Sequence, residues 1–230
     1  LAGGGRRRRA PAAGVSRAYQ EALLPMKGSR RSFAIRTMQL GELAFDRVSG
    51  NLEIGGGRLS LGNLRFAFLG GDVLADADFV FAPAGTRRMN LDAELSGVDL
   101  SALGALTLAG SSDISGNLRL EVDFNQKSFA ASTNLTHIGR STLQAVLAGI
   151  DPAGTNPGVE ELSGFLTKHR VSPRRVSLHI RHGLLRLEVA FREMGLAARA
   201  AAGLIEGFRG TTFRLPSIQV GGLISKYLGF

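Results

Sequence analysis

The chain of 230 residues contains no cysteine, no tryptophan and only two tyrosines, Tyr19 and Tyr227. Without cysteine it forms neither disulfides nor thiolate metal sites, and it is compatible with an oxidising or a reducing compartment. No apolar run approaches the ~20 residues that a membrane-spanning helix needs. The chain begins with a segment rich in glycine and arginine that lacks the apolar stretch of a signal peptide. We therefore expect the sequence to be a piece of a longer protein.

The residues that usually carry catalysis are also scarce. The four histidines occur without an HExxH motif and without a serine in a catalytic context. His179 and His182 could face each other across a turn as metal ligands, but no carboxylate accompanies them. Gly55–Gly57 lacks the lysine and hydroxyl residue of a phosphate-binding loop. The sequence predicts a protein that is not an enzyme and that holds no metal and no cofactor.

The positive charge is concentrated at the start of the chain. The formal net charge is +9, and residues 1–31 contribute +7 of it, so the remaining 199 residues carry only +2. We expect residues 1–31 to form a flexible basic linker, with a short helix over residues 15–24 that ends before Pro25. In the rest of the chain, the alternating phenylalanines stand beside leucine, valine and alanine, and the opposite face mixes both charge signs. This pattern argues against a nucleic-acid partner.

Short apolar alternations interrupted by glycines dominate the chain from Leu40 to Phe81. Leu59 and Leu61 share one parity, and the large apolar residues after Gly62-Asn63 share the other. Such alternation is typical of β-strands that have one apolar and one polar face. The same pattern recurs later in the chain, so residues 32–230 are predicted to form one mainly β module.

Helical spacing of apolar residues replaces the alternation in three places. Residues 141–150 and 159–168 place apolar side chains three and four positions apart, and residues 196–208 are rich in alanine. We predict short helices there, the first two as an insert at about 140–170 between strand regions. The fold class is therefore mainly β, a largely antiparallel sheet with a few short helices.

The alternation leaves three interpretations of the apolar face. It could pack against another sheet or helices as an ordinary core. It could face lipid from an outer-membrane β-barrel, although the scarcity of tyrosine and tryptophan argues against this. It could also line an open groove that holds acyl chains. Periodicity does not separate the core from the groove.

A resemblance favours the groove. Residues 40–79 read LGELAFDRVSGNLEIGGGRLSLGNLRFAFLGGDVLADADF. An apolar strand over Asn51–Ile54 is followed by a glycine-marked turn and strand over Gly57–Leu61. Another strand over Leu64–Phe68 then ends in Gly70-Gly71. This order of parts resembles the repeated sequence of the AsmA-like family of bacterial envelope proteins.

A second stretch carries the same resemblance. GVDLSALGAL at Gly97–Leu106 and SDISGNLRLEV at Ser112–Val122 are similar to the helical turn and following strand of that family. Residues 33–135 show the resemblance best, and the C-terminal part shows it more loosely. The chain departs from the family because it lacks the N-terminal membrane helix and is short for a span between two membranes.

The resemblance implies a long, curved β-sheet whose apolar groove carries phospholipids between the inner and outer membranes. It implies a periplasmic location in the envelope of a Gram-negative bacterium, with a membrane anchor in a segment that this chain does not contain. The partners would be phospholipids and envelope membrane proteins. The predicted lipid-binding residues are Leu59, Leu61, Leu64, Phe66, Phe68, Phe79, Phe81, Leu91, Leu95, Leu118, Leu120, Val122 and Phe124.

A different function uses the same sheet. An assembly protein of the envelope, active in outer-membrane protein biogenesis, would bind polypeptide strands at the edge of the sheet and not lipid on its face. The outer-membrane β-barrel is the third alternative.

Overall fold

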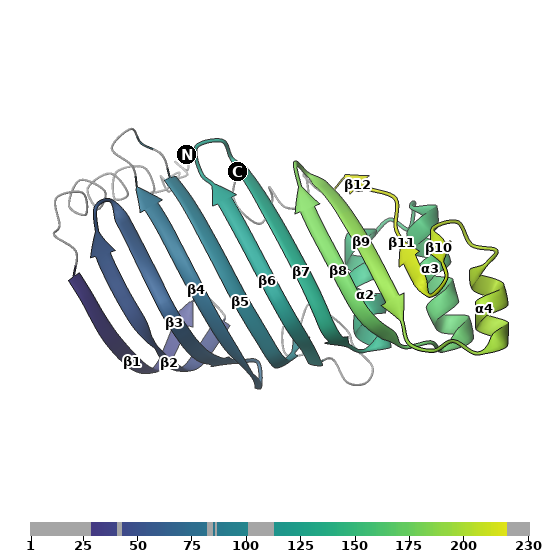
Figure 1. Ribbon diagram of the computed structural model, residues 1–230, viewed down its shortest axis with the longest axis horizontal. Helices are drawn as coiled ribbons and strands as arrows, with labels where there is room; N and C mark the ends of the chain where they lie inside the picture. The colour runs from purple at the N-terminus through teal and green to yellow at the C-terminus, as the bar shows by residue number, and fades with distance from the viewer. Residues whose placement is uncertain (1–28, 41–42, 82–84, 86, 101–112, 220–230) are drawn as a thin grey trace, which may run out of the picture.

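One antiparallel sheet of 12 strands makes up most of the molecule (Figure 1). The computed structural model describes residues 29–40, 43–81, 85, 87–100 and 113–219. The strands are β1 (Ser29–Leu40), β2 (Leu43–Gly55), β3 (Arg58–Phe68), β4 (Gly71–Phe81), β5 (Arg87–Asp99), β6 (Asp113–Asp123), β7 (Ser128–Ile138), β8 (Pro173–Arg181), β9 (Leu184–Phe191), β10 (Phe208–Arg209), β11 (Thr212–Arg214) and β12 (Ile218–Gln219).

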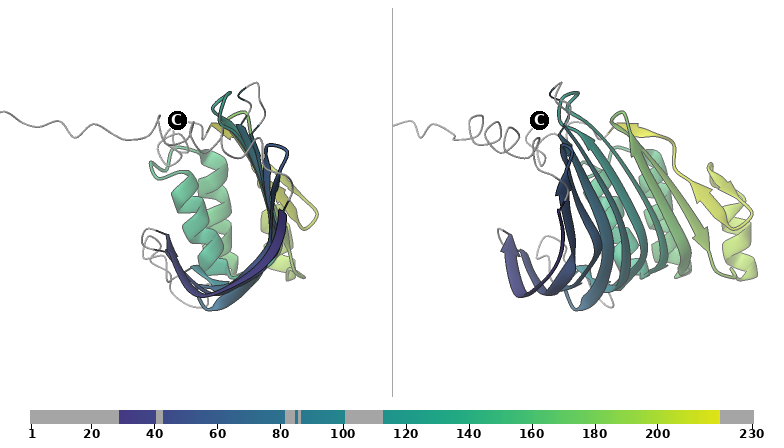
Figure 2. Two further views of the ribbon diagram at one scale, coloured as in Figure 1. Left: turned by 90° about the vertical axis from the view of Figure 1, so that its left-hand side faces the viewer. Right: turned by 60° about the vertical axis from the view of Figure 1, so that its left-hand side comes forward.

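The strands follow one another in the sheet nearly as they do in the chain. β1 to β9 lie side by side in sequence order, and β11 and β12 both pair with β9. β1 is one edge of the sheet and β10 the other, so the sheet is open. Viewed along its length, it bends into a trough-shaped arc (Figure 2). The predicted mainly β, curved, antiparallel fold is confirmed.

Three helices follow the first seven strands: α2 (Arg140–Ile150), α3 (Pro157–His169) and α4 (Leu196–Ala202). α3 begins where the Asn156 side chain accepts hydrogen bonds from the backbone N–H groups of Gly158 and Val159. Pro157 occupies the first turn, where its missing N–H costs nothing. The helices predicted at 141–150 and 159–168 are confirmed. None of the described helices is long and apolar enough to cross a membrane.

Two predicted boundaries are wrong. The helix expected over 196–208 ends at Ala202, because the chain turns after it and reaches β10 through Gly207, whose φ of +93° favours glycine. The linker predicted over residues 1–31 extends three residues too far, because residues 29–31 belong to β1 and pair with β2, with Ser29 opposite Ile54.

Residues 1–28 and 101–112 lie outside the described part of the chain, and with them most of the helical turn expected at 97–106. Its first three residues belong to β5.

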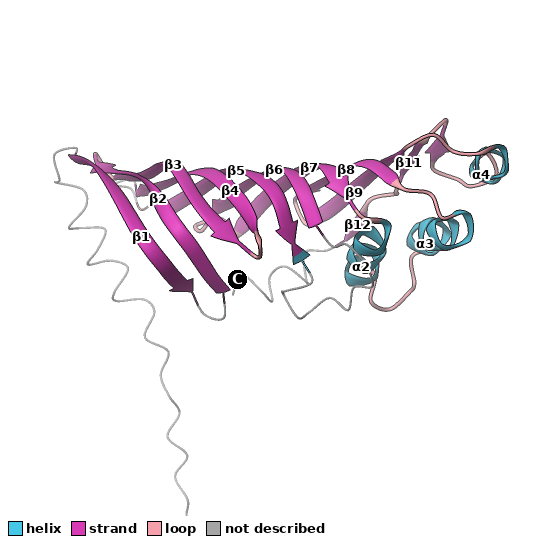
Figure 3. Ribbon diagram, turned by 90° about the horizontal axis from the view of Figure 1, so that it is seen from below, coloured by secondary structure: helices cyan, strands magenta, loops and turns pink. Residues whose placement is uncertain are grey.

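The core lies at the C-terminal end of the sheet, on its concave side. α2 and α3 lie inside the arc (Figures 2 and 3), where four of their leucines are fully buried. They share one apolar cluster with residues of β8 and β9, including Val176 and Val189. A buried leucine contributes about 1.5–3 kcal/mol through loss of apolar surface to water. The four leucines are Leu143, Leu147, Leu162 and Leu166.

Candidate functional site

The concave face of β2 to β6, which we call the trough, is lined by apolar side chains in register. Residues directly opposite each other in an antiparallel pair share one face of the sheet. Four such rows cross from β3 to β6. The rows are Leu59–Phe79–Met89–Val122, Leu61–Ala77–Leu91–Leu120, Leu64–Ala75–Ala93–Leu118 and Phe66–Val73–Leu95–Gly116.

A β-bulge in β3 keeps the two halves of that strand on the same face. Leu61 pairs with Ala77 and Leu64 pairs with Ala75, so the register shifts between them. Asn63, with φ of +50°, provides the extra residue, and its backbone N–H donates to the Asp76 carboxylate at 2.8 Å. Asparagine tolerates this left-handed conformation better than most residues. The change of parity seen in the sequence is therefore a bulge, and the apolar side stays continuous.

The structure brings twelve of the thirteen predicted lipid-binding residues onto this one face. Phe68 and Phe81 extend it at the ends of β3 and β4, opposite Gly71 and Arg87. Val122 is 3% exposed, and the other eleven side chains are half-buried. Phe124 follows the last residue of β6 and is 45% exposed. Alternation alone did not establish a common face, and the strand register does.

Some trough residues were not among those predicted. Phe45 of β2 stacks on Phe68 with ring centroids 5.0 Å apart and meets Phe66 edge-on at 5.4 Å. Half-buried Phe45 and buried Val48 differ in parity, because Arg47 adopts φ of +55° in an irregular part of β2. The alternation of β2 breaks there, so the sequence pattern did not predict that Phe45 lies in the trough. Ala75, Ala77, Ala93 and Met89 were missed because they are small or unbranched, although their parity was visible.

The described helices lie over one end of the trough only. α2 and α3 lie over the concave face near β8 and β9 (Figure 3), and their side chains complete the core there. No described helix lies over β2 to β5. Within the described residues, helices cover the concave face only near β8 and β9, while the same face at β3 to β6 carries half-buried large side chains beside buried Val73, Ala75 and Ala77.

The opposite, convex face of the same strands is polar. The Arg58 guanidinium donates to both carboxylate oxygens of Asp78, at 3.0 and 2.6 Å, and the Ser60 hydroxyl donates to the same carboxylate at 2.6 Å. These bonds from Arg58 and then Ser60 hold the pKa of Asp78 below its usual value. Arg119 pairs with Asp92 at 2.6 Å across β5 and β6. These strands therefore separate a mainly apolar concave side from a mainly polar convex side.

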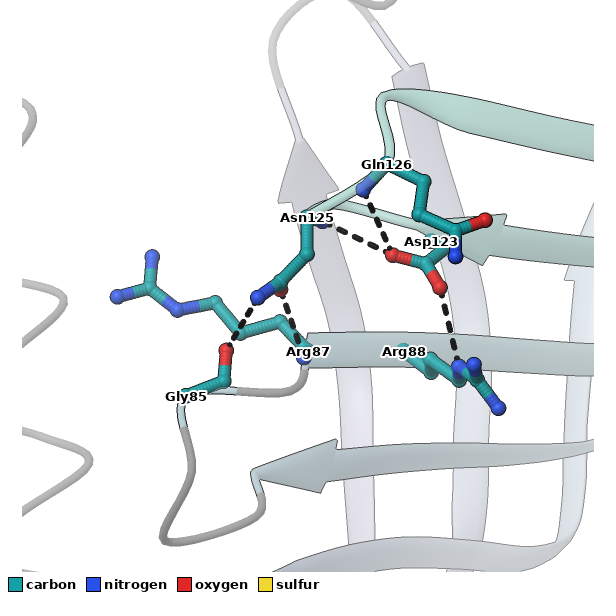
Figure 4. Close-up of polar contacts among 6 residues, drawn as sticks. All are labelled: Gly85, Arg87, Arg88, Asp123, Asn125 and Gln126. Carbon is teal, nitrogen blue, oxygen red and sulfur yellow. Dashed lines mark hydrogen bonds and ion pairs between the residues drawn. The ribbon is translucent and has the colours of Figure 1, made fainter.

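Polar contacts fix the lip of the trough beside Phe124 (Figure 4). Asp123 accepts hydrogen bonds from the backbone N–H groups of Asn125 and Gln126 at 3.0 and 2.9 Å, and from Arg88 at 3.1 Å. The bond from Gln126 and those from Arg88 and Asn125 lower the pKa of Asp123. The Asn125 side chain accepts from the Arg87 N–H and donates to the Gly85 carbonyl, at 2.9 and 2.7 Å. This ties the β4–β5 connection to the β6–β7 hairpin.

The histidines do not assemble into a metal site in the described part of the chain, where no group of three or more histidine, aspartate or glutamate side chains could hold an ion. His179 lies on the polar face of β8 opposite Arg186, and His182 occupies the β8–β9 turn with φ of +51°.

Comparisons with known proteins give no match: no family model, no curated protein and no solved structure is similar enough to the chain to count as one. The function is therefore argued from the trough and its surroundings.

Proposed function

We propose that the chain is a non-enzymatic module that binds phospholipids, with the acyl chains in the trough and the headgroups in water. The observation that carries the proposal is the single concave face that holds twelve predicted residues, eleven of them half-buried and Val122 buried, without a described helix over β2 to β5. Exposed apolar surface costs about 25 cal/mol per Å². A contiguous apolar face of this kind marks an interaction site.

The dimensions of the trough suit an acyl chain. Adjacent strands lie about 4.8 Å apart, so β2 to β6 span roughly 19 Å from the first strand axis to the last. Half of the ~30 Å hydrocarbon core of a bilayer, which is one acyl-chain layer, is about 15 Å. One chain lying across the strands would fit within the trough. Binding would follow buried apolar area and would need few polar contacts.

The finer part of the proposal rests on the resemblance of residues 33–135 to the AsmA-like family. That resemblance supports a place in the periplasm of a Gram-negative bacterium and movement of phospholipids between the inner and outer membranes. A further segment of the protein would then provide the membrane anchor.

A second candidate function is supported by β1. This edge strand is 12 residues long and contains no proline, and Ile35 and Met38 are 44% and 39% exposed. Long edge strands without proline are templates for pairing with another polypeptide. The alternative function is therefore β-strand addition at β1 during assembly of envelope proteins.

Photo-crosslinking separates the two functions. We would place a photoreactive phenylalanine analogue at Phe66 in the trough, at Arg65 on the convex face of the same strand, and at Ile35 on the edge. Irradiated protein purified from bacterial cells would be analysed for attached phospholipid and attached polypeptide. We expect phospholipid on the Phe66 variant and none on the Arg65 variant, because neighbouring residues of a strand face opposite sides.

A charge in the trough provides a second readout. Leu91→Asp should lower the phospholipid that co-purifies with the protein more than tenfold, a difference of about 1.4 kcal/mol, because it places an unpaired carboxylate among apolar groups. Asn90→Asp adds the same charge on the convex face and should leave the lipid content unchanged. Circular dichroism checks that both variants fold. Absence of lipid from the parent protein, together with polypeptide captured at Ile35, would instead establish the second function.

A further inference from the structure

A hollow on the convex face lies where β8, β9 and β11 meet, on the side of the sheet away from the trough. Its volume is about 720 Å³. Its polar lining comes from both sheet and connecting segments. The lining side chains that matter here are Thr136, Arg174, Arg175, Arg192, Glu193 and Thr212.

A β-bulge directs two successive arginines into this hollow. Pro173 pairs with Phe191 and Arg175 pairs with Ala190, so β8 has one extra residue there, Arg174. In a regular strand, neighbouring side chains point to opposite faces. Here Pro173 is buried, whereas Arg174 and Arg175 are both exposed and both line the hollow. Bulges often redirect a side chain in this way beside functional sites.

The three guanidiniums have no carboxylate partner among the described residues. No ion pair joins Arg174, Arg175 or Arg192 to a described acidic side chain. Glu188, on the same face of β9, is already bound by Arg214 at 2.8 Å. Glu193 lines the hollow but lies beyond 4.0 Å of these nitrogens, so three positive groups face one negative group.

We infer that this hollow binds a phosphate group, either as a free phosphate or as the phosphate of a lipid headgroup. A guanidinium presents N–H donors in a fork that matches phosphate oxygens, and such charge-assisted bonds are about twice as strong as neutral ones. The excess of two positive charges suits a phosphate dianion, and the hydroxyls of Thr136 and Thr212 offer further donors. Leu196, which is 86% exposed, lies four residues after Arg192. Because an exposed leucine is suited to contact a lipid surface, a lipid headgroup is one of the two phosphate sources to be tested.

Titration calorimetry on the full chain tests the inference with two probes. One probe is inorganic phosphate, and the other is vesicles of phosphatidylcholine with and without phosphatidic acid. The test variant combines Arg174→Gln, Arg175→Gln and Arg192→Gln. A control variant with the same loss of charge combines Arg65→Gln, Arg181→Gln and Arg186→Gln, exposed arginines that also have no ion pair with described residues. Thermal unfolding verifies that both variants are folded.

We expect the test variant to bind at least ~10-fold more weakly than the parent, and the control variant to bind as the parent does. Binding of inorganic phosphate alone supports the site and shows that free phosphate suffices. Binding that requires phosphatidic acid supports the site and identifies the lipid headgroup as the source. Equal weakening in the control variant, or no binding of either probe by the parent, overturns the inference. Lipid capture at Phe66 concerns the other face and is measured separately.

Discussion

Single residues decide which side of the sheet their neighbours face. Without the extra residue Asn63, the second half of β3 would turn Leu64 and Phe66 toward the convex face. The bulge at Arg174 has the opposite result, because it collects two charged side chains on one side. The alternation in the sequence therefore predicts which face of the sheet a residue lies on only within a stretch of strand that contains no bulge.

The first prediction concerns Asp123, whose pKa is lowered by its bonds from Gln126, Arg88 and Asn125. A carboxyl with a lower pKa in the folded chain stabilises the fold above its ordinary value of 3.8. That contribution disappears as the pH falls through the folded-state pKa. We expect Asp123→Asn to be less stable than the parent at neutral pH, and the gap to close in acid below 3.8. Urea unfolding across this range measures it, and a gap independent of pH would contradict it.

Among the secondary-structure elements, the helices could be predicted from the sequence, but the face of the sheet that they cover could not. Spacing of three and four residues identifies α2 and α3, and it also identifies their apolar stripes. It does not say which surface those stripes cover, since that depends on how the preceding strands curve. The structure shows them on the concave face near β8 and β9, sharing one cluster with those strands.

The packing of α3 predicts a large effect of one substitution. Leu162 is fully buried, so Leu162→Ala should lower the free energy of unfolding by about 2–5 kcal/mol through lost contacts and a cavity. Leu196→Ala, the same change at a helical residue that is 86% exposed, should stay within about 0.5 kcal/mol. Chemical denaturation compares the two. Similar values for both variants would show that α3 does not anchor the core.

The strands and their common face could be predicted because both depend on local alternation. Leu59, Leu91 and Leu120 were identified in this way, and the register places them as expected. The arginine hollow could not be predicted, because Thr136 and Arg192 are distant in sequence and meet only through strand pairing. The charged start of β1 was read as a linker because an edge strand can leave both faces in water.

The whole molecule is stabilised unevenly along its length. β8 and β9 carry six buried apolar side chains: Pro173, Val176, Leu185, Leu187, Val189 and Phe191. In β1, the described side chains are exposed apart from half-buried Phe33. Local opening is easiest where few apolar contacts hold the backbone. We predict that amide hydrogens exchange faster in β1 and β2 than in β8 and β9, as measured by mass spectrometry of peptides. Uniform exchange across the sheet would refute this gradient.

The position of α2 and α3 also gives the trough a polarity. Where these helices cover the concave side, their apolar side chains pack against those of the sheet in one cluster, so the described apolar surface is covered at that end. No described helix lies over the opposite end, and no described strand pairs with the outer edge of its last strand, β1. A strand added there would lengthen the apolar surface without disturbing the core. Within the described part of the chain, the uncovered end of the apolar surface could therefore be extended by strand addition at β1.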